Sequence, residues 1–244
     1  MRIRSSLTLG YMIGILWLRR NFLSMIWLFS TPFTILFLFY VIIGEKALPN
    51  AIVGAFIMFF IGAGVQVMGD AVWLKLELKY QDILVASRVS VIDYMVGLAL
   101  AELFFASPGI ICLLVPLLFL IRGGILEVLT IILVPSIMWL FVSCISFYFS
   151  TLIPNARNGW QISSLLDLFL TILPPTFYPI EVIPTTIRPL AYLIPTTHAA
   201  LLLKQSVGLA TLSLFDMIFS WVSLMVSLAL SLILAMNKSE WRQK

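Results

Sequence analysis

The chain has few charged residues for its length. Asp, Glu, Lys and Arg make up 11% of its 244 residues, whereas 61% are apolar and the mean hydropathy is +1.10. A water-soluble fold of this size needs polar groups over its whole surface, and so few charges cannot cover it. The composition therefore indicates a protein that crosses a lipid bilayer as helices.

Residues and motifs that support catalysis are also scarce. His198 is the only histidine, which excludes an HExxH zinc site, and Cys112 and Cys144 lie inside apolar runs rather than in a CxxC pair. The sequence contains no GxSxG motif and no GxxxxGK[ST] phosphate-binding loop. We therefore expect no catalytic residue, no metal site and no cofactor bound by this chain itself.

The net charge of +4 does not indicate a nucleic-acid-binding protein. The Lys and Arg residues flank apolar runs, where they meet phospholipid headgroups and set the topology. We therefore expect membrane lipid as a partner and no nucleic acid.

The apolar runs predict an all-α polytopic membrane protein with a single transmembrane domain over residues 1–244. Residues 5–20 are expected to form an interfacial helix, because the fourteen residues between Arg4 and Arg19 span about 21 Å as a helix. That length is short for a membrane core of about 30 Å. The six predicted spans are residues 22–43, 51–72, 94–121, 126–151, 161–177 and 214–236.

The distribution of Lys and Arg predicts the orientation. With a cytosolic N-terminus, the inner segments hold eleven of these residues and the outer segments hold four. The positive-inside rule then puts both termini in the cytosol, in a cytoplasmic membrane.

Residues 74–93 form a predicted cytoplasmic segment that mixes charged and apolar side chains. The apolar positions recur at helical spacing at Leu76, Tyr80, Ile83, Leu84 and Ser87. One interpretation is a helix that presses its apolar face into a groove of another protein. The other is a helix that lies on lipid.

Residues 174–211 form a predicted outer segment that contains six prolines but is largely apolar from residue 180 to residue 203. Irregular apolar backbone at membrane depth must be shielded by protein or face water. The pattern therefore predicts short re-entrant helices between spans five and six. A loop folded on the headgroups is the alternative.

Three carboxyl residues lie inside predicted spans: Asp70, Glu102 and Asp167. Intramembrane carboxyl groups are costly, so each must be protonated, paired or hydrated. They either line a substrate path or make hydrogen bonds between helices. Glu102 is the deepest of the three and the best candidate for a pathway residue.

A family resemblance rests first on the cytoplasmic segment. Glu77, followed by Asp82 to Ser90, resembles the segment after the second span of ABC-2 type exporter permeases, although Arg88 stands where that family has proline. The resemblance implies that this segment contacts an ATPase. The implied coupling residues are Glu77, Tyr80, Ile83, Leu84, Ser87 and Arg88.

The outer segment is similar to the same family. The run Phe177 to Pro184 resembles the family's proline-containing stretch after span five, and Pro195-Thr196-Thr197 resembles its continuation. The resemblance implies an outer cap of half-membrane helices. Its implied residues are Phe177, Tyr178, Pro179, Pro184 and Pro195.

The resemblance implies the membrane subunit of an ATP-driven exporter. Two copies of the chain, as a homodimer, would work with two separate ATPase subunits that hold ATP and Mg²⁺. The apolar composition favours hydrophobic, amphipathic or lipid-linked cargo. An ATP-independent secondary transporter or channel is the alternative, and a membrane assembly protein that transports nothing is a third possibility.

Overall fold

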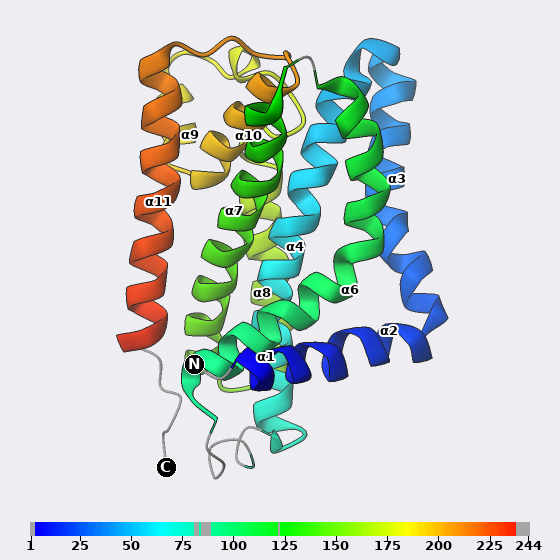
Figure 1. Cartoon of the computed structure of the whole chain (residues 1–244), viewed down its shortest axis with the longest axis vertical. Coiled ribbons are helices and arrows are strands. Elements are labelled where there is room, and N and C mark those ends of the chain that lie inside the picture. Colours follow the sequence, from blue (N-terminus) through cyan, green and yellow to red (C-terminus); the bar gives the residue numbers. More distant parts are fainter. Residues whose placement is uncertain (1–2, 81–82, 84–88, 122, 238–244) are drawn as a thin grey trace.

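The computed structural model describes residues 3–80, 83, 89–121 and 123–237 (Figure 1). Within these residues every regular element is a helix, as predicted. In chain order the elements are α1 (Ile3–Gly10), η1 (Tyr11–Ile15), α2 (Leu16–Arg20), α3 (Phe22–Ile43), η2 (Glu45–Ala47), α4 (Leu48–Leu76), α6 (Val91–Leu120), α7 (Ile125–Leu152), α8 (Ala156–Thr171), η3 (Ile180–Val182), α9 (Arg188–Ala191), α10 (Pro195–Ser206) and α11 (Leu214–Asn237).

Among the described residues, four helical runs are long and apolar enough to cross a membrane. They are Glu45–Leu76, which contains α4, and the helices α6, α7 and α11. Pro32–Ile43, within α3, is a further apolar stretch of shorter length, and α8 has 16 residues. The structure therefore supports a helical membrane protein with four candidate spans.

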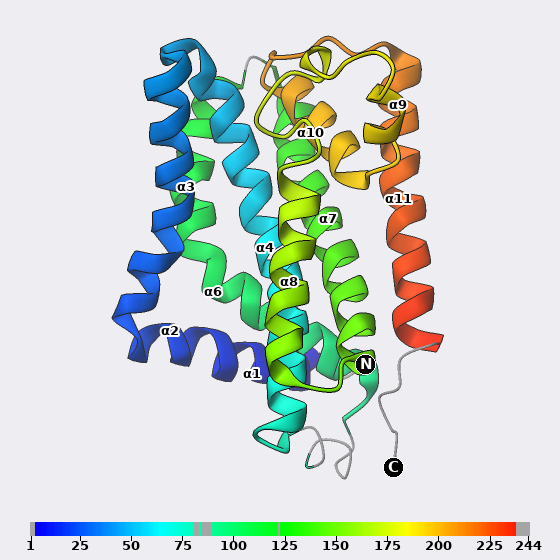
Figure 2. The same ribbon diagram turned by 180° about the vertical axis from the view of Figure 1, so that it is seen from behind.

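Helix α4 lies at the centre of the bundle, in contact with α3, α6, α7, α8 and α10 (Figures 1 and 2). Its most apolar stretch is 72% buried, whereas that of α11 is 17% buried. This difference follows from position, because α11 packs mainly on α7 and α10 at one side of the bundle.

The helix formed by α1, η1 and α2 lies across one end of the bundle, alongside the first half of α6 (Figure 1). The two helices touch backbone to backbone, because a Cβ atom at Gly14 would overlap the carbonyl of Ala101. Farther along, the rings of Trp17 and Phe105 meet edge to face with centroids 5.5 Å apart. The predicted bounds of 5–20 agree closely with this helix, which runs from Ile3 to Arg20.

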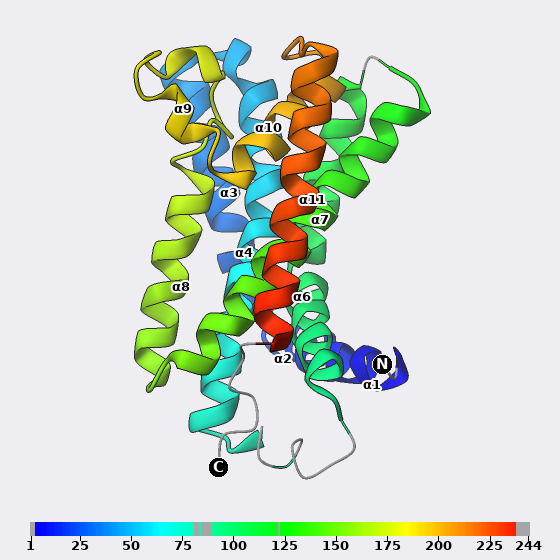
Figure 3. The same ribbon diagram turned by 90° about the vertical axis from the view of Figure 1, so that its left-hand side faces the viewer.

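Helix α6 changes direction part-way along its length (Figures 1 and 3). Pro108 lies inside the helix and has no N–H group to donate to the carbonyl of Phe104. The Ser107 hydroxyl donates to that carbonyl instead, at a distance of 2.7 Å. The hydrogen bond replaces the one lost at the proline and allows the bend.

The prediction for span five, residues 161–177, was wrong in its bounds. Helix α8 begins at Ala156, where Asn155 Oδ1 accepts a hydrogen bond from the Asn158 N–H at 2.8 Å, and it ends at Thr171. Pro174 and Pro175 cannot continue the helix. The Thr176 hydroxyl donates to the Thr171 carbonyl at 2.5 Å and satisfies one of the free acceptors at the helix end.

The two ends of the bundle carry different elements. The α1–α2 helix, the end of α4 and the end of α11 lie at one end, and η3, α9 and α10 lie at the other (Figures 1 and 2). Within the outer segment, α10 is buried in the bundle against α7, α11 and α4.

Candidate functional site

The polar residues of three helices converge between α4, α6 and α8. Gln66 and Asp70 belong to α4, Glu102 to α6 and Asp167 to α8. All four side chains line cavities in this region. The structure thus brings the three carboxyl residues singled out in the sequence to one part of the bundle.

Asp70 and Glu102 interact through their side chains. Glu102 is 9% exposed and Asp70 is half-buried. Two ionised carboxylates would repel each other, so a proton or a positive charge beside them stabilises the pair.

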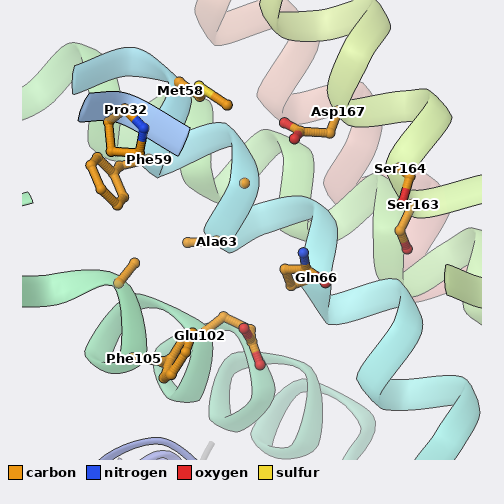
Figure 4. A pocket seen from close by; sticks show the side chains of 12 residues that line it. Pro32, Met58, Phe59, Ala63, Gln66, Glu102, Phe105, Ser163, Ser164 and Asp167 are labelled. Carbon is orange, nitrogen blue, oxygen red and sulfur yellow. The ribbon is translucent and has the colours of Figure 1, made fainter. Parts of the chain in front are cut away.

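The first cavity, which we call the serine cavity, has a volume of about 220 Å³ (Figure 4). Glu102 and Gln66 line one side of it, and Ser163, Ser164 and Asp167 of α8 line the other. The Ser163 and Ser164 hydroxyls donate to carbonyls one turn back in α8, and Asp167 Oδ1 accepts a hydrogen bond from the Thr171 hydroxyl at 3.1 Å. Asp167 therefore has a partner on its own helix and lines the same cavity as Glu102.

The second cavity, which we call the tryptophan cavity, has a volume of about 450 Å³. It shares Gln66, Glu102 and Phe105 with the serine cavity, so the two adjoin. Its remaining lining residues are Ile13, Gly14, Trp17, Asp70, Trp73 and Trp160. The cavity is thus bounded by the α1–α2 helix, α4, α6 and α8, with carboxyl groups in a largely aromatic wall.

The sequence prediction missed the aromatic residues and Gln66. A signal was present, because Gln66, Asp70 and Trp73 follow the helical spacing i, i+4, i+7 and therefore lie on one face of α4. Glu102 and Phe105 repeat the pattern one turn apart on α6. Only the structure shows that these two faces meet.

The predicted coupling segment lies partly outside the described residues. Helix α4 extends to Leu76, Lys79 has a positive φ of 53°, and Ser90 and Asp93 form a capping box that begins α6. A single helical face from Leu76 through Tyr80 is therefore wrong, because the backbone turns at Lys79.

The coupling residues themselves are not brought together by the described structure. Glu77 and Ile83 are exposed, and Tyr80 is half-buried against the hydrophobic core. Leu84, Ser87 and Arg88 lie outside the described residues.

The predicted cap residues are spread over the outer segment. Phe177 is buried, with its ring 5.8 Å from that of Phe39 on α3, and the Tyr178 hydroxyl donates to the Leu173 carbonyl at 2.8 Å. Pro179 precedes η3, Pro184 follows it, and Pro195 is the first residue of α10. Proline suits that first position because the helix needs no N–H donor there.

Lys204, which was not predicted as a site residue, holds the first residues of the outer segment to α10. Its side chain is 3% exposed, and Nζ donates to the carbonyls of Pro175 and Tyr178 at 2.6 and 2.5 Å. Burial lowers the pKa of the Lys204 ammonium to about 8, and the negative charge of Glu181 opposes this shift. The lysine is an internal clamp between two segments 26 to 29 residues apart in sequence.

His198 joins three elements of the same region. Its Nε2 atom lies 2.9 Å from the Tyr192 carbonyl, and its Nδ1 atom lies 3.1 Å from Ser220 Oγ on α11. Since a carbonyl only accepts, Nε2 carries the proton, and Nδ1 of the neutral ring accepts from Ser220. Burial lowers the pKa of His198, and the hydrogen bond with the Tyr192 carbonyl opposes this shift. The histidine is structural rather than catalytic in this arrangement.

The part of the chain that the structure describes contains no group of three His, Cys, Asp or Glu residues able to hold a metal ion. Its cavities instead offer carboxyl groups, an amide and aromatic rings. These groups suit the binding of an organic molecule.

Comparison with known families identifies the chain. The sequence pattern of the family described as ABC-2 type transporter matches residues 14–207, which is well over half of the chain. The chain belongs to the ABC-2 type transporter family. The match covers the end of η1 and every described element from α2 to α10, and therefore most of the outer segment and every residue that lines the two cavities except Ile13. No curated protein shows significant sequence similarity to this ABC-2 chain.

Proposed function

We propose that this ABC-2 chain is the membrane subunit of an ATP-driven exporter for hydrophobic, amphipathic or lipid-linked cargo. The observation that carries the proposal is the family match over residues 14–207, because permeases of this family generally work with an ABC ATPase subunit. The sequence contains no phosphate-binding loop, so ATP and Mg²⁺ belong to the separate ATPase.

The proposed topology has six spans, formed by α3, α4, α6, α7, α8 and α11, with α10 as a re-entrant helix at the outer end. Both termini are cytosolic and the membrane is the cytoplasmic one. The common end of α1 and α11 supports this arrangement. The eleven inner against four outer basic residues support its direction.

Coupling is proposed to pass through residues 74–93 and the α1–α2 helix. Glu77 and Ile83 are exposed, and Glu77 directly follows α4, which ends beside the end of the bundle that carries α1 and α2. ATP-driven closure of the ATPase pair would press on this end and part the helices of two permease copies. Cargo would then leave past the outer segment.

The test is co-expression with the ABC ATPase encoded nearest to this chain. We expect a stoichiometric complex whose ATPase activity rises on reconstitution with the permease. Leu84→Asp should abolish that rise while the permease still inserts. Leu193→Asp, on an exposed residue at the opposite end, is the matched control and should keep the rise. Reproducible absence of any ATPase from the purified permease would falsify the proposal.

The buried Asp70–Glu102 pair is the observation that favours the second candidate, an ATP-independent secondary transporter. ATP depletion distinguishes the two functions. Export that stops when ATP is depleted and persists when the proton gradient is collapsed supports the exporter, and the reverse pattern supports the secondary transporter. A membrane assembly protein would show export under neither condition.

A further inference from the structure

The tryptophan cavity combines charge and aromatic surface in a repeated pattern. On α4, Asp70 is followed one turn later by Trp73, and on α6, Glu102 is followed one turn later by Phe105. Each helix therefore presents a carboxyl group and an aromatic ring on the same face. The ring faces and the carboxyl groups both attract positive charge.

Another wall of the tryptophan cavity is the ring of Trp160, whose position depends on a glycine. The ring of Trp160 on α8 lies so close to Gly69 of α4 that a Cβ atom there would overlap ring carbons. Trp17 closes another side and is held by its edge-to-face contact with Phe105. The aromatic walls thus come from four separate segments and are positioned by specific contacts.

The polar part of the cavity is incompletely satisfied. Oε1 of Gln66 is buried and accepts no hydrogen bond from any described residue. Buried polar atoms without partners are uncommon, and one that lines two cavities points to a ligand group. A carbonyl oxygen can only accept, so that group is a donor or a positive charge.

No lysine or arginine is among the described residues that line either cavity. Asp70 and Glu102 thus have no protein cation beside them in either cavity. A ligand with a single positive charge would stabilise the ionised form of these carboxyl groups. At about 450 Å³, the cavity matches the size of sites for small organic molecules.

We propose that the tryptophan cavity binds a lipophilic organic monocation, such as an alkylated or arylated ammonium ion. The positive centre lies against Asp70 and Glu102, and the apolar substituents lie against Trp17, Trp73 and Trp160. These three tryptophans are 50%, 42% and 40% exposed, which leaves the cavity accessible from the end of the bundle that carries the α1–α2 helix. That such a cation is cargo rests on the proposed exporter function, whereas its binding does not.

The test uses two probes of the same shape and opposite charge. Purified protein in lipid nanodiscs, without any ATPase, is dialysed against labelled tetraphenylphosphonium or tetraphenylborate, and binding is measured above that of empty nanodiscs. We expect saturable binding of the cation and only lipid-like partitioning of the anion. Equal saturable binding of the two probes would overturn the proposal.

The carboxyl groups are tested by the double variant Asp70→Asn/Glu102→Gln. We expect its affinity for tetraphenylphosphonium to fall by about tenfold or more, because the negative charge is lost. Glu127→Gln, on a carboxyl residue that lines neither cavity, should bind like the wild type. A double variant that binds the cation as tightly as the wild type would contradict the site, and would leave the carboxyl pair as a proton site only.

The aromatic walls are tested separately, so that a misfolded double variant cannot decide the outcome. Gly69→Ala displaces the Trp160 ring and Trp73→Leu removes a wall, and each should weaken cation binding by about threefold to tenfold. Trp221→Leu on α11 is the control and should have no effect. Unchanged binding in both wall variants would overturn the proposal.

The two proposals fail separately. Protein that binds the cation but never associates with an ATPase contradicts the exporter function and keeps this site. Protein that stimulates its ATPase but does not distinguish the two probes contradicts this site and keeps the exporter function.

Discussion

Buried polar groups are arranged differently at the two ends of the molecule. At the α9–α10 end, Lys204 and His198 are bonded to backbone carbonyls and to Ser220. At the α1–α2 end, the Asp70 and Glu102 carboxyl groups line a cavity beside each other, and Gln66 Oε1 has no partner in the described structure. The first arrangement stabilises a fold, and the second leaves binding capacity free.

Among the predictions that test this comparison, the largest loss of stability is expected when the Lys204 contacts are removed. Lys204→Met leaves the carbonyls of Pro175 and Tyr178 without a donor in a buried place. We expect the free energy of unfolding to fall by about 3 kcal/mol, measured by denaturant titration in detergent. Lys46→Met, on an exposed lysine at the same end of the bundle, is the control and should change it little. A Lys204→Met variant as stable as the control would show that the clamp contributes nothing.

The second largest loss of stability is expected when the His198 contacts are removed. His198→Leu removes partners from Tyr192 and Ser220 and should cost about 2 kcal/mol of unfolding free energy, with Ser220→Ala costing about half as much. Thr130→Ala removes a hydroxyl that bonds only within α7, so it is a control that should cost less than either. Equal losses in all three variants would mean that the contact between helices has no special value.

A pH titration sharpens the comparison further. Lys204 has a pKa of about 8 in the folded protein against an ordinary value of 10.5, so between these values the unfolded chain binds more protons. Stability therefore rises with pH across this window. We expect a gain of about 1 kcal/mol between about pH 7 and about pH 9 in the wild type relative to Lys204→Met. Parallel pH profiles of the two proteins would contradict the lowered pKa.

The smallest effect is expected at the cavity. In Glu102→Gln the neutral amide has the shape of the carboxyl group and can donate to Asp70, so the free energy of unfolding should change by less than about 0.5 kcal/mol. Glu102→Leu offers no such donor and should cost about 2 kcal/mol, because Asp70 is left unpaired. Thermal unfolding of the two variants side by side measures the difference. A large loss in Glu102→Gln would show that the pair is part of the structural framework.

Much of the helical framework could be predicted from the sequence, because apolar runs long enough to span a bilayer have few alternatives to a helix. The predicted bounds for residues 22–43 and 214–236 agree closely with α3 and α11. The predicted bounds of span five, residues 161–177, were wrong because the apolar run continues past Thr171, whereas the helix ends before Pro174 and Pro175. The turn at Lys79 was missed for a related reason, since helical spacing in a sequence does not reveal a residue with positive φ.

The candidate site was less predictable. Asp70, Glu102 and Asp167 could be selected because charge inside an apolar run is costly, but their positions relative to one another depend on how α4, α6 and α8 are rotated and bent. The tryptophans carry no such signal, because these rings are common near the ends of membrane spans. That Trp17 from the α1–α2 helix shares a cavity with Trp160, more than a hundred residues later, follows only from the packing.

The close contact between Gly14 and Ala101 has a mechanical consequence. Two helices that touch backbone to backbone move as one body, and Ala101 lies directly before Glu102, on the same side of the bend at Pro108. A tilt of the α1–α2 helix would therefore shift Glu102 relative to Asp70 and change the shape of the tryptophan cavity. Affinity for the proposed cation and the tilt of this helix would then vary together.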